Sequence, residues 1–180
     1  MFDKQYRFKG RHALRVDQLT SAFDSVSKPK LFERNIDIYV NAPLVGFLYG
    51  RMADLDDEKD PDNGQVYNEN VMGDRVMYSQ AELLFNFQLI MLLDKEYEPN
   101  KDARIDKAFR STGKNPNDEA RFDSYVRGGI DVLYEKLIEG ANDPNDYITR
   151  LYEFIEEFEE RFNNSVDPDS ILSLCIKADD

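Results

Sequence analysis

The hydrophobic residues of this chain recur mostly at intervals of three and four positions, the spacing that lines one face of an α-helix. Residues 79–97 are apolar nearly all round, so we expect this segment to be the central helix of a bundle. Further helices are expected over residues 13–26, 31–52, 101–111, 116–140 and 145–163, and in a short segment that begins at Pro168. The inward face of the helix over 145–163 is expected to be formed by Ile148, Leu151, Ile155, Phe158 and Phe162.

One segment can be interpreted in two ways. Ile36, Ile38 and Val40 alternate with polar residues like a strand, whereas Ile36 and Tyr39 follow one face of a helix. No nearby segment alternates in the same way, and a strand without partners is not stable. We therefore predict a helix that kinks or restarts near Pro43.

Residues 53–74 show no periodicity and are rich in Asp, Asn and Gly, so we expect a long acidic loop there. An EF-hand calcium loop does not fit, because Lys59 and Asn70 would occupy positions that need carboxylates. Loose cation binding by the aspartates of this loop stays open, although a solvated loop is favoured. The expected fold class is all-α, a compact bundle of about six or seven helices. Residues 1–180 are expected to form a single domain, with residues 1–12 as a basic N-terminal arm.

Two adjacent glycines, Gly128 and Gly129, lie inside the helix predicted over residues 116–140. Each costs about 1 kcal/mol relative to alanine in a helix interior, so some interaction must offset this cost. Gly129 falls on the apolar face, and small residues also cluster around Gly46, so we expect these two segments to cross closely. The alternative is that the glycines expose backbone to a ligand such as a phosphate near Arg127. Phosphate-binding loops usually precede a helix, however, which favours packing.

Charge is unevenly distributed along the chain, whose net charge is −13. Residues 1–34 hold eight Lys or Arg against four Asp or Glu, and the remaining residues hold 15 against 32. Aromatic residues are interleaved with cations in residues 4–15, so this segment is a candidate for nucleic-acid or partner contact through Arg7, Lys9, Arg11 and Arg15. Because the rest of the chain is strongly acidic, we favour pairing of these cations with the protein's own acidic body or with a sister subunit.

The sequence lacks the motifs of the common catalytic machineries. His12 is the only histidine, which excludes metal sites with two or more histidines, and the surroundings of Cys175, the only cysteine, indicate no activation. No phosphate-binding G-x-x-x-x-G-K-[ST] or G-x-G-x-x-G motif is present. Glu153 and Glu156, or Glu156 and Glu159, form the E-x-x-E half of a magnesium-binding motif, but the E-x-x-D half does not follow. We therefore assign no catalytic, cofactor-binding or metal-ligating residue.

The sequence shows neither a secretory signal nor an apolar stretch of bilayer length, which predicts a soluble, cytoplasmic protein without membrane contact. The favoured function is a non-enzymatic protein-interaction module, an accessory or regulatory subunit that presents an acidic helical surface to a protein partner or to a second copy. The alternative is a nucleic-acid-binding subunit that acts through the basic N-terminal arm. The only enzymatic hypothesis that the sequence leaves open is a carboxylate–metal hydrolase, and it is the least supported of the three hypotheses.

Overall fold

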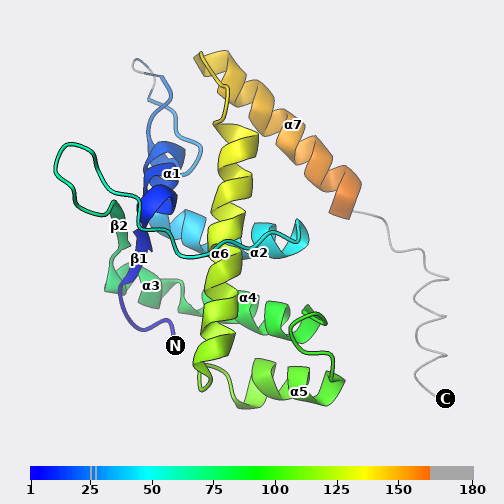
Figure 1. Cartoon of the computed structure of the whole chain (residues 1–180). Coiled ribbons are helices and arrows are strands. Elements are labelled where there is room, and N and C mark those ends of the chain that lie inside the picture. The colour runs from blue at the N-terminus through cyan, green and yellow to red at the C-terminus, as the bar shows by residue number, and fades with distance from the viewer. Residues whose placement is uncertain (25, 27, 163–180) are drawn as a thin grey trace.

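The computed structural model describes residues 1–24, 26 and 28–162. The chain is mostly helical, as the hydrophobic spacing predicts, with a small two-stranded sheet beside the helices (Figure 1). The helices are α1 (Gly10–Thr20), α2 (Asn35–Leu48), α3 (Gly73–Tyr78), α4 (Gln80–Leu93), α5 (Lys101–Ile105) followed by a π-helical turn (Asp106–Arg110), α6 (Pro116–Leu137) and α7 (Pro144–Phe162). The long helix α6 runs through the middle of the molecule. Every helix that the structure describes is too short or too polar to cross a membrane.

The prediction of a purely helical chain is wrong at the N-terminus. Strand β1 (Tyr6–Lys9) pairs antiparallel with β2 (Asn68–Val71), so that the two segments form a short ribbon. Phe8 is buried whereas Arg7 and Lys9 are exposed, which is the two-residue period of a strand. Four residues are too few for a two-residue period to be recognised in the sequence, and the partner strand lies about 60 residues further along the chain. The sequence pattern therefore did not predict this strand.

The first helix lies closer to the N-terminus than the pattern predicts. It spans Gly10–Thr20, whereas the apolar spacing suggested 13–26. Beyond its end, the Ser21 hydroxyl donates to the Asp17 carbonyl at 2.7 Å, a side-chain bond that competes with continuation of the helix. The segment predicted as an arm over residues 1–12 therefore includes β1 and the first residues of α1.

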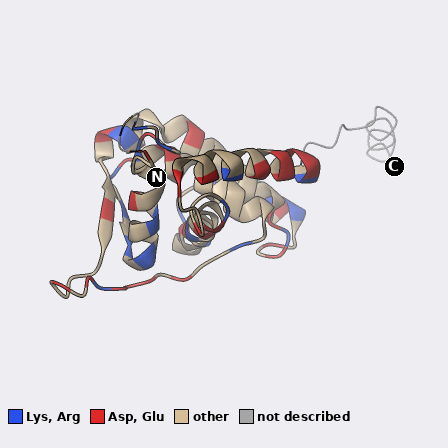
Figure 2. Ribbon diagram, turned by 90° about the horizontal axis from the view of Figure 1, so that it is seen from above, with Lys and Arg blue, Asp and Glu red and all other residues tan. Residues whose placement is uncertain are grey.

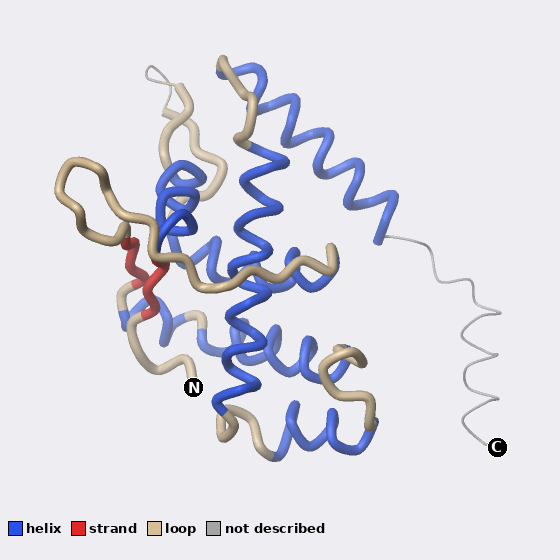
Figure 3. The backbone as a smooth tube through the Cα atoms, viewed as in Figure 1, coloured by secondary structure: helices blue, strands red, loops and turns tan. Residues whose placement is uncertain are grey.

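Secondary structure interrupts the segment predicted as a loop over residues 53–74. Both β2 and the start of α3 lie within it, and the irregular stretch that precedes β2 crosses α6 (Figure 3). The Ala53 N–H donates to the Ser124 carbonyl at 3.1 Å, and Nε of Arg127 donates to the Ala53 carbonyl at 2.8 Å. These bonds fix the beginning of the stretch to α6.

Helix α2 spans Asn35–Leu48, so the helical interpretation of this ambiguous segment is confirmed. Pro43 lies inside the helix and has no N–H, which leaves the Tyr39 carbonyl without its helical donor. In the same turn, the buried amide of Asn86 from α4 donates to the Val40 carbonyl at 2.7 Å. The proline turn of α2 is thereby tied to α4.

Helices α2 and α6 cross with their backbones in contact. A Cβ atom added to Gly129 would overlap the carbonyl oxygen of Ala42 and lie 2.9 Å from the amide nitrogen of Gly46. A Cβ atom added to Gly46 would likewise overlap the backbone of α6, and one added to Gly128 would overlap the carbonyl of Arg51. All three glycines are therefore covered by protein backbone, and the α2–α6 contact is the most extensive between any two elements.

A buried carboxylate ties the end of α4 to α6. Asp94 accepts hydrogen bonds from Nε of Arg121 and from the Tyr125 hydroxyl, both at 2.8 Å, and from the Tyr97 N–H at 3.0 Å. Burial opposes ionisation of Asp94, but these donors outweigh it and lower the pKa of the carboxyl group. The N-terminal half of α6 is held against α4 by this network.

Replacing Gly129 with alanine tests the helix crossing. At an open helical position this change would stabilise the protein by about 1 kcal/mol. Here the new Cβ overlaps backbone atoms that cannot move independently, so we expect the free energy of unfolding to fall by about 3 kcal/mol. Urea unfolding followed by circular dichroism measures the change. Gly73→Ala is the control, because its Cβ would lie 3.4 Å from the nearest atom. A Gly129→Ala protein as stable as the parent would contradict the close crossing.

Candidate functional site

The four basic residues predicted to contact nucleic acid or a partner lie near one another, on β1 and α1, but differ in their surroundings. Arg7 and Lys9 are exposed on the strand, and Nε of Arg7 donates to Oδ1 of Asn70 on the neighbouring strand at 3.2 Å. Arg11 and Arg15 instead meet acidic side chains of the protein itself. The basic segment is therefore only partly open to another molecule.

Asp131 of α6 is the centre of this charge cluster and is only 4% exposed. It forms an ion pair with Arg15, and Nη2 of Arg11 lies 3.8 Å from its Oδ2. His12 is buried and places Nε2 3.2 Å from Oδ1 of Asp131, outside hydrogen-bonding geometry. Asp56 accepts the main-chain N–H of Arg11 at 2.8 Å. Burial opposes ionisation of Asp131, but His12 and Arg15 outweigh it and lower its pKa.

The acidic side chains do not gather into a metal centre in the part of the chain that the structure describes. There, no group of three or more His, Cys, Asp or Glu residues is placed to hold an ion. The loop aspartates considered for loose cation binding include Asp56, which faces Arg11, and Asp60, which accepts the Asp62 N–H at 2.8 Å. Cys175 and the helix predicted after Pro168 lie outside the described residues.

Helix α7 is the element least covered by the rest of the protein. None of its residues is buried, although Phe154 packs against the core. The prediction that Ile148, Leu151 and Ile155 face inward is wrong, because these side chains are 46%, 37% and 45% exposed. The helix begins beside the C-terminal end of α6 and diverges from it, as Figure 1 shows. Its apolar face is consequently covered only in part.

An apolar groove lies along the inner edge of this helix. We call it the α7 groove; its volume is about 400 Å³. Its lining residues come from α2, α6, α7 and the segment before α2, and they are Phe32, Asn41, Val45, Leu133, Phe154, Ile155, Phe158 and Glu159. Acidic residues line the C-terminal half of α7 beside it (Figure 2). The surface therefore combines an apolar cleft with a negative border.

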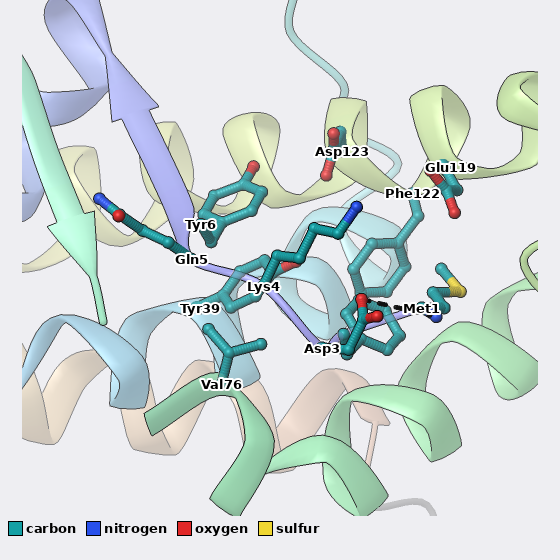
Figure 4. Close-up of a pocket in the computed structure, with 11 residues that line it drawn as sticks. Met1, Asp3, Lys4, Gln5, Tyr6, Tyr39, Val76, Glu119, Phe122 and Asp123 are labelled. Carbon is teal, nitrogen blue, oxygen red and sulfur yellow. Dashed lines mark ion pairs between the residues drawn. The ribbon is translucent and has the colours of Figure 1, made fainter. Parts of the chain in front are cut away.

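A second cavity, which we call the N-terminal pocket, has a volume of about 380 Å³ and lies between residues 1–6 and the helices α2, α3 and α6 (Figure 4). The ring of Tyr6 stacks on that of Tyr39, with centroids 3.9 Å apart. Asp123 of α6 also lines the pocket. Burial raises the pKa of Asp123 to about 6, although the charge of Arg127 and the hydroxyl of Tyr6 oppose this rise.

Sequence reasoning missed the N-terminal pocket entirely. Glu119 and Asp123 are four positions apart, which places both on one face of α6, but this spacing is common on solvated helices. The aromatic residues of the N-terminal segment suggested only contact with a nucleic acid or a partner. Their position over α2 depends on the β1–β2 pairing, which the sequence pattern did not reveal.

Replacing Asp131 with asparagine tests the charge cluster. Arg15 and Arg11 would lose their shared counter-charge, so we expect the free energy of unfolding to fall by about 3 kcal/mol at neutral pH. Folding lowers the pKa of Asp131, so its stabilising effect is present above the unfolded-state pKa of about 4 and is lost as the pH falls below it. Urea titrations at several pH values should show the variant and the parent converging in acid.

The matched control for this variant is Glu135→Gln. It removes one partner of the exposed ion pair between Arg51 and Glu135, in which Nη2 and Oε1 are 2.7 Å apart. Such surface pairs contribute at most about 1 kcal/mol. Equal losses from the two substitutions would contradict a special role for the buried carboxylate.

Replacing Asp123 with asparagine should have the opposite effect on the stability of the protein. Because folding raises the pKa of Asp123 to about 6, the ionised carboxylate opposes folding as the pH rises through that value. Asp123→Asn should therefore have a higher melting temperature than the parent at about pH 8, and the difference should vanish below about pH 4. Thermal unfolding across this pH range provides the measurement. A variant that is less stable at pH 8 would show that the carboxylate is favourably solvated.

Comparisons with known proteins yield no match to this chain. No protein-family model, no curated protein and no solved structure is detectably similar to it. The functional proposals therefore rest on the chemistry and geometry of its own residues.

Proposed function

We propose that this protein is a non-enzymatic interaction subunit that binds a basic amphipathic helix of a protein partner along α7. The observation that carries the proposal is the exposed apolar stripe of Ile148, Leu151 and Ile155, which adjoins the α7 groove. An amphipathic helix binds such a groove through apolar residues spaced three and four apart. Contiguous apolar surface of this kind is typical of interaction sites. The single cysteine of the sequence fits a reducing, cytoplasmic setting for the complex.

Charge favours a basic partner over a second copy of the chain. Helix α7 contains six acidic residues against two arginines. Glu157 is already paired with Lys136 at 2.5 Å and with Arg161 at 3.2 Å. The other glutamates of α7 form no ion pair with a described residue; they are Glu153, Glu156, Glu159 and Glu160. Two copies meeting along this helix would bring like charges together, whereas Lys or Arg at the edges of a partner helix would neutralise them.

The structure offers less support for nucleic-acid binding through the N-terminal segment. Arg11 and Arg15 are engaged by Asp131, and Asp56 lies beside Arg11. Contact with phosphates would have to compete with these intramolecular pairs. Of the four candidate residues, Arg7 and Lys9 form no ion pair with a described residue. The attraction of two cations for nucleic-acid phosphates is small compared with the repulsion between the phosphates and a strongly acidic protein.

A labelled helical peptide of leucine and lysine, roughly 18 residues long, tests the proposal against the full chain. Fluorescence anisotropy should show binding, and a peptide in which glutamate replaces every lysine should not bind. Ile155→Asn should weaken binding about tenfold, because it places a polar group in the apolar contact without changing the charge.

The control for this experiment is Phe85→Asn, which changes an exposed apolar residue of α4 in the same way. It should leave the affinity unchanged. Equal effects of the two substitutions would mean that the peptide does not bind specifically along α7, which would overturn the proposal. A dimer in light scattering that Ile155→Asn dissociates would also overturn it, because the occupant of the groove would then be a second copy.

A further inference from the structure

The N-terminal pocket shares no lining residue with the α7 groove, so it is a separate candidate site. Its volume of about 380 Å³ lies within the range of small-ligand sites. Segments from four parts of the chain meet there, namely residues 1–6, α2, α3 and α6. Figure 4 shows their side chains converging around the cavity.

Two carboxyl groups on successive turns of α6 line the pocket without an ion pair. Neither Glu119 nor Asp123 lies within 4.0 Å of a basic group of any described residue. Lys4 extends across the pocket toward α6 in Figure 4, but it forms no ion pair with either carboxyl group. The third acidic residue of the lining, Asp3, faces the amino terminus at 3.9 Å. Neither carboxyl group of α6 therefore has a cationic partner at contact distance, although the Tyr6 hydroxyl interacts with Asp123.

The hydroxyl of Tyr39 is a further polar group of the pocket lining that has no hydrogen-bond partner among the described residues. Tyr39 is only 3% exposed and lines the pocket, yet its hydroxyl makes no hydrogen bond within the described part of the chain. The hydroxyl oxygen is not among the fully buried unpartnered polar atoms of the described residues, so it is open to the cavity. The unpartnered hydroxyl and the two carboxyl groups together present hydrogen-bond acceptors to the cavity.

Aromatic rings form much of the rest of the lining. Phe122 is buried between the carboxylate-bearing turns of α6, and the ring of Phe2 meets it edge to face with centroids 5.6 Å apart. The stacked rings of Tyr6 and Tyr39 form a second wall. Aromatic faces accommodate the carbon skeleton of a ligand and also attract cations.

We propose that the N-terminal pocket binds a small organic amine. Its ammonium group would donate hydrogen bonds to Glu119, Asp123 and the Tyr39 hydroxyl, while its carbon skeleton lies against the aromatic walls. An anion would face carboxylates on α6, and a neutral molecule would leave their charge uncompensated. Lys4 would then be a competitor, because its ammonium group reaches toward the same side of α6.

Three ligands of one shape test the proposal on the untagged full chain: phenethylamine, 2-phenylethanol and phenylacetate. Isothermal titration calorimetry should show the amine binding at least about tenfold more tightly than the alcohol, and the acid not binding. In two-dimensional NMR spectra the amine should shift the resonances of Tyr39 and Val76. Equal affinity for the amine and the alcohol would overturn the proposal.

Variants separate the named contacts from general attraction to an acidic protein. Glu119→Gln and Tyr39→Phe should each weaken amine binding about fivefold or more, whereas Lys4→Ala should strengthen it. Glu82→Gln on the exposed surface of α4 removes the same charge as Glu119→Gln and should change nothing. Unfolding curves confirm that each variant is folded. Amine binding that is insensitive to Glu119→Gln and Tyr39→Phe in folded protein would overturn the assignment of the pocket.

Discussion

The backbone contact between α2 and α6 determines where both cavities can form. Tyr39 and Val45 lie on either side of Ala42 in α2, and they line the N-terminal pocket and the α7 groove respectively. On α6, Asp123 and Leu133 are arranged in the same way around Gly129. Because no side chain separates the helices at the crossing, each cavity lies between elements whose separation is fixed by backbone contact.

The distribution of charge follows from the way in which the N-terminal segment folds back. Part of the excess positive charge in residues 1–34 forms ion pairs with Asp131 and Asp56. These pairs stabilise the packing of α1 against α6 and against the loop that contains Asp56. The acidic residues of α7 receive little of this compensation, since only Glu157 is paired there. A partner that meets this protein therefore encounters a local negative surface, whose attraction for cations is stronger at low ionic strength.

The sequence predicted the features that appear in it as a regular spacing of apolar residues or as a residue unfavourable for its secondary structure. Most helices follow from apolar spacing, and the glycine pair in α6 was unusual because it weakens a helix that otherwise has strong propensity. The strand β1 was missed because four residues carry little periodicity and their partner is distant. The orientation of α7 was also wrong, since spacing identifies an apolar face but not the element that covers it. The N-terminal pocket required the folded chain, because Tyr39 and Asp123 meet only in three dimensions.

The crossing also bears on whether the two cavities influence each other. Coupling between distant sites requires an element with two arrangements whose balance each ligand shifts. Side chains at a helix interface can exchange rotamers when one helix slides, but Gly46 and Gly129 have no side chain, and the backbones of the two helices are already in close contact there. The contact therefore favours a single arrangement of α2 on α6. Helix α7 lacks such a constraint because none of its residues is buried, so adjustment to a partner should occur there without being transmitted through α6 to the N-terminal pocket.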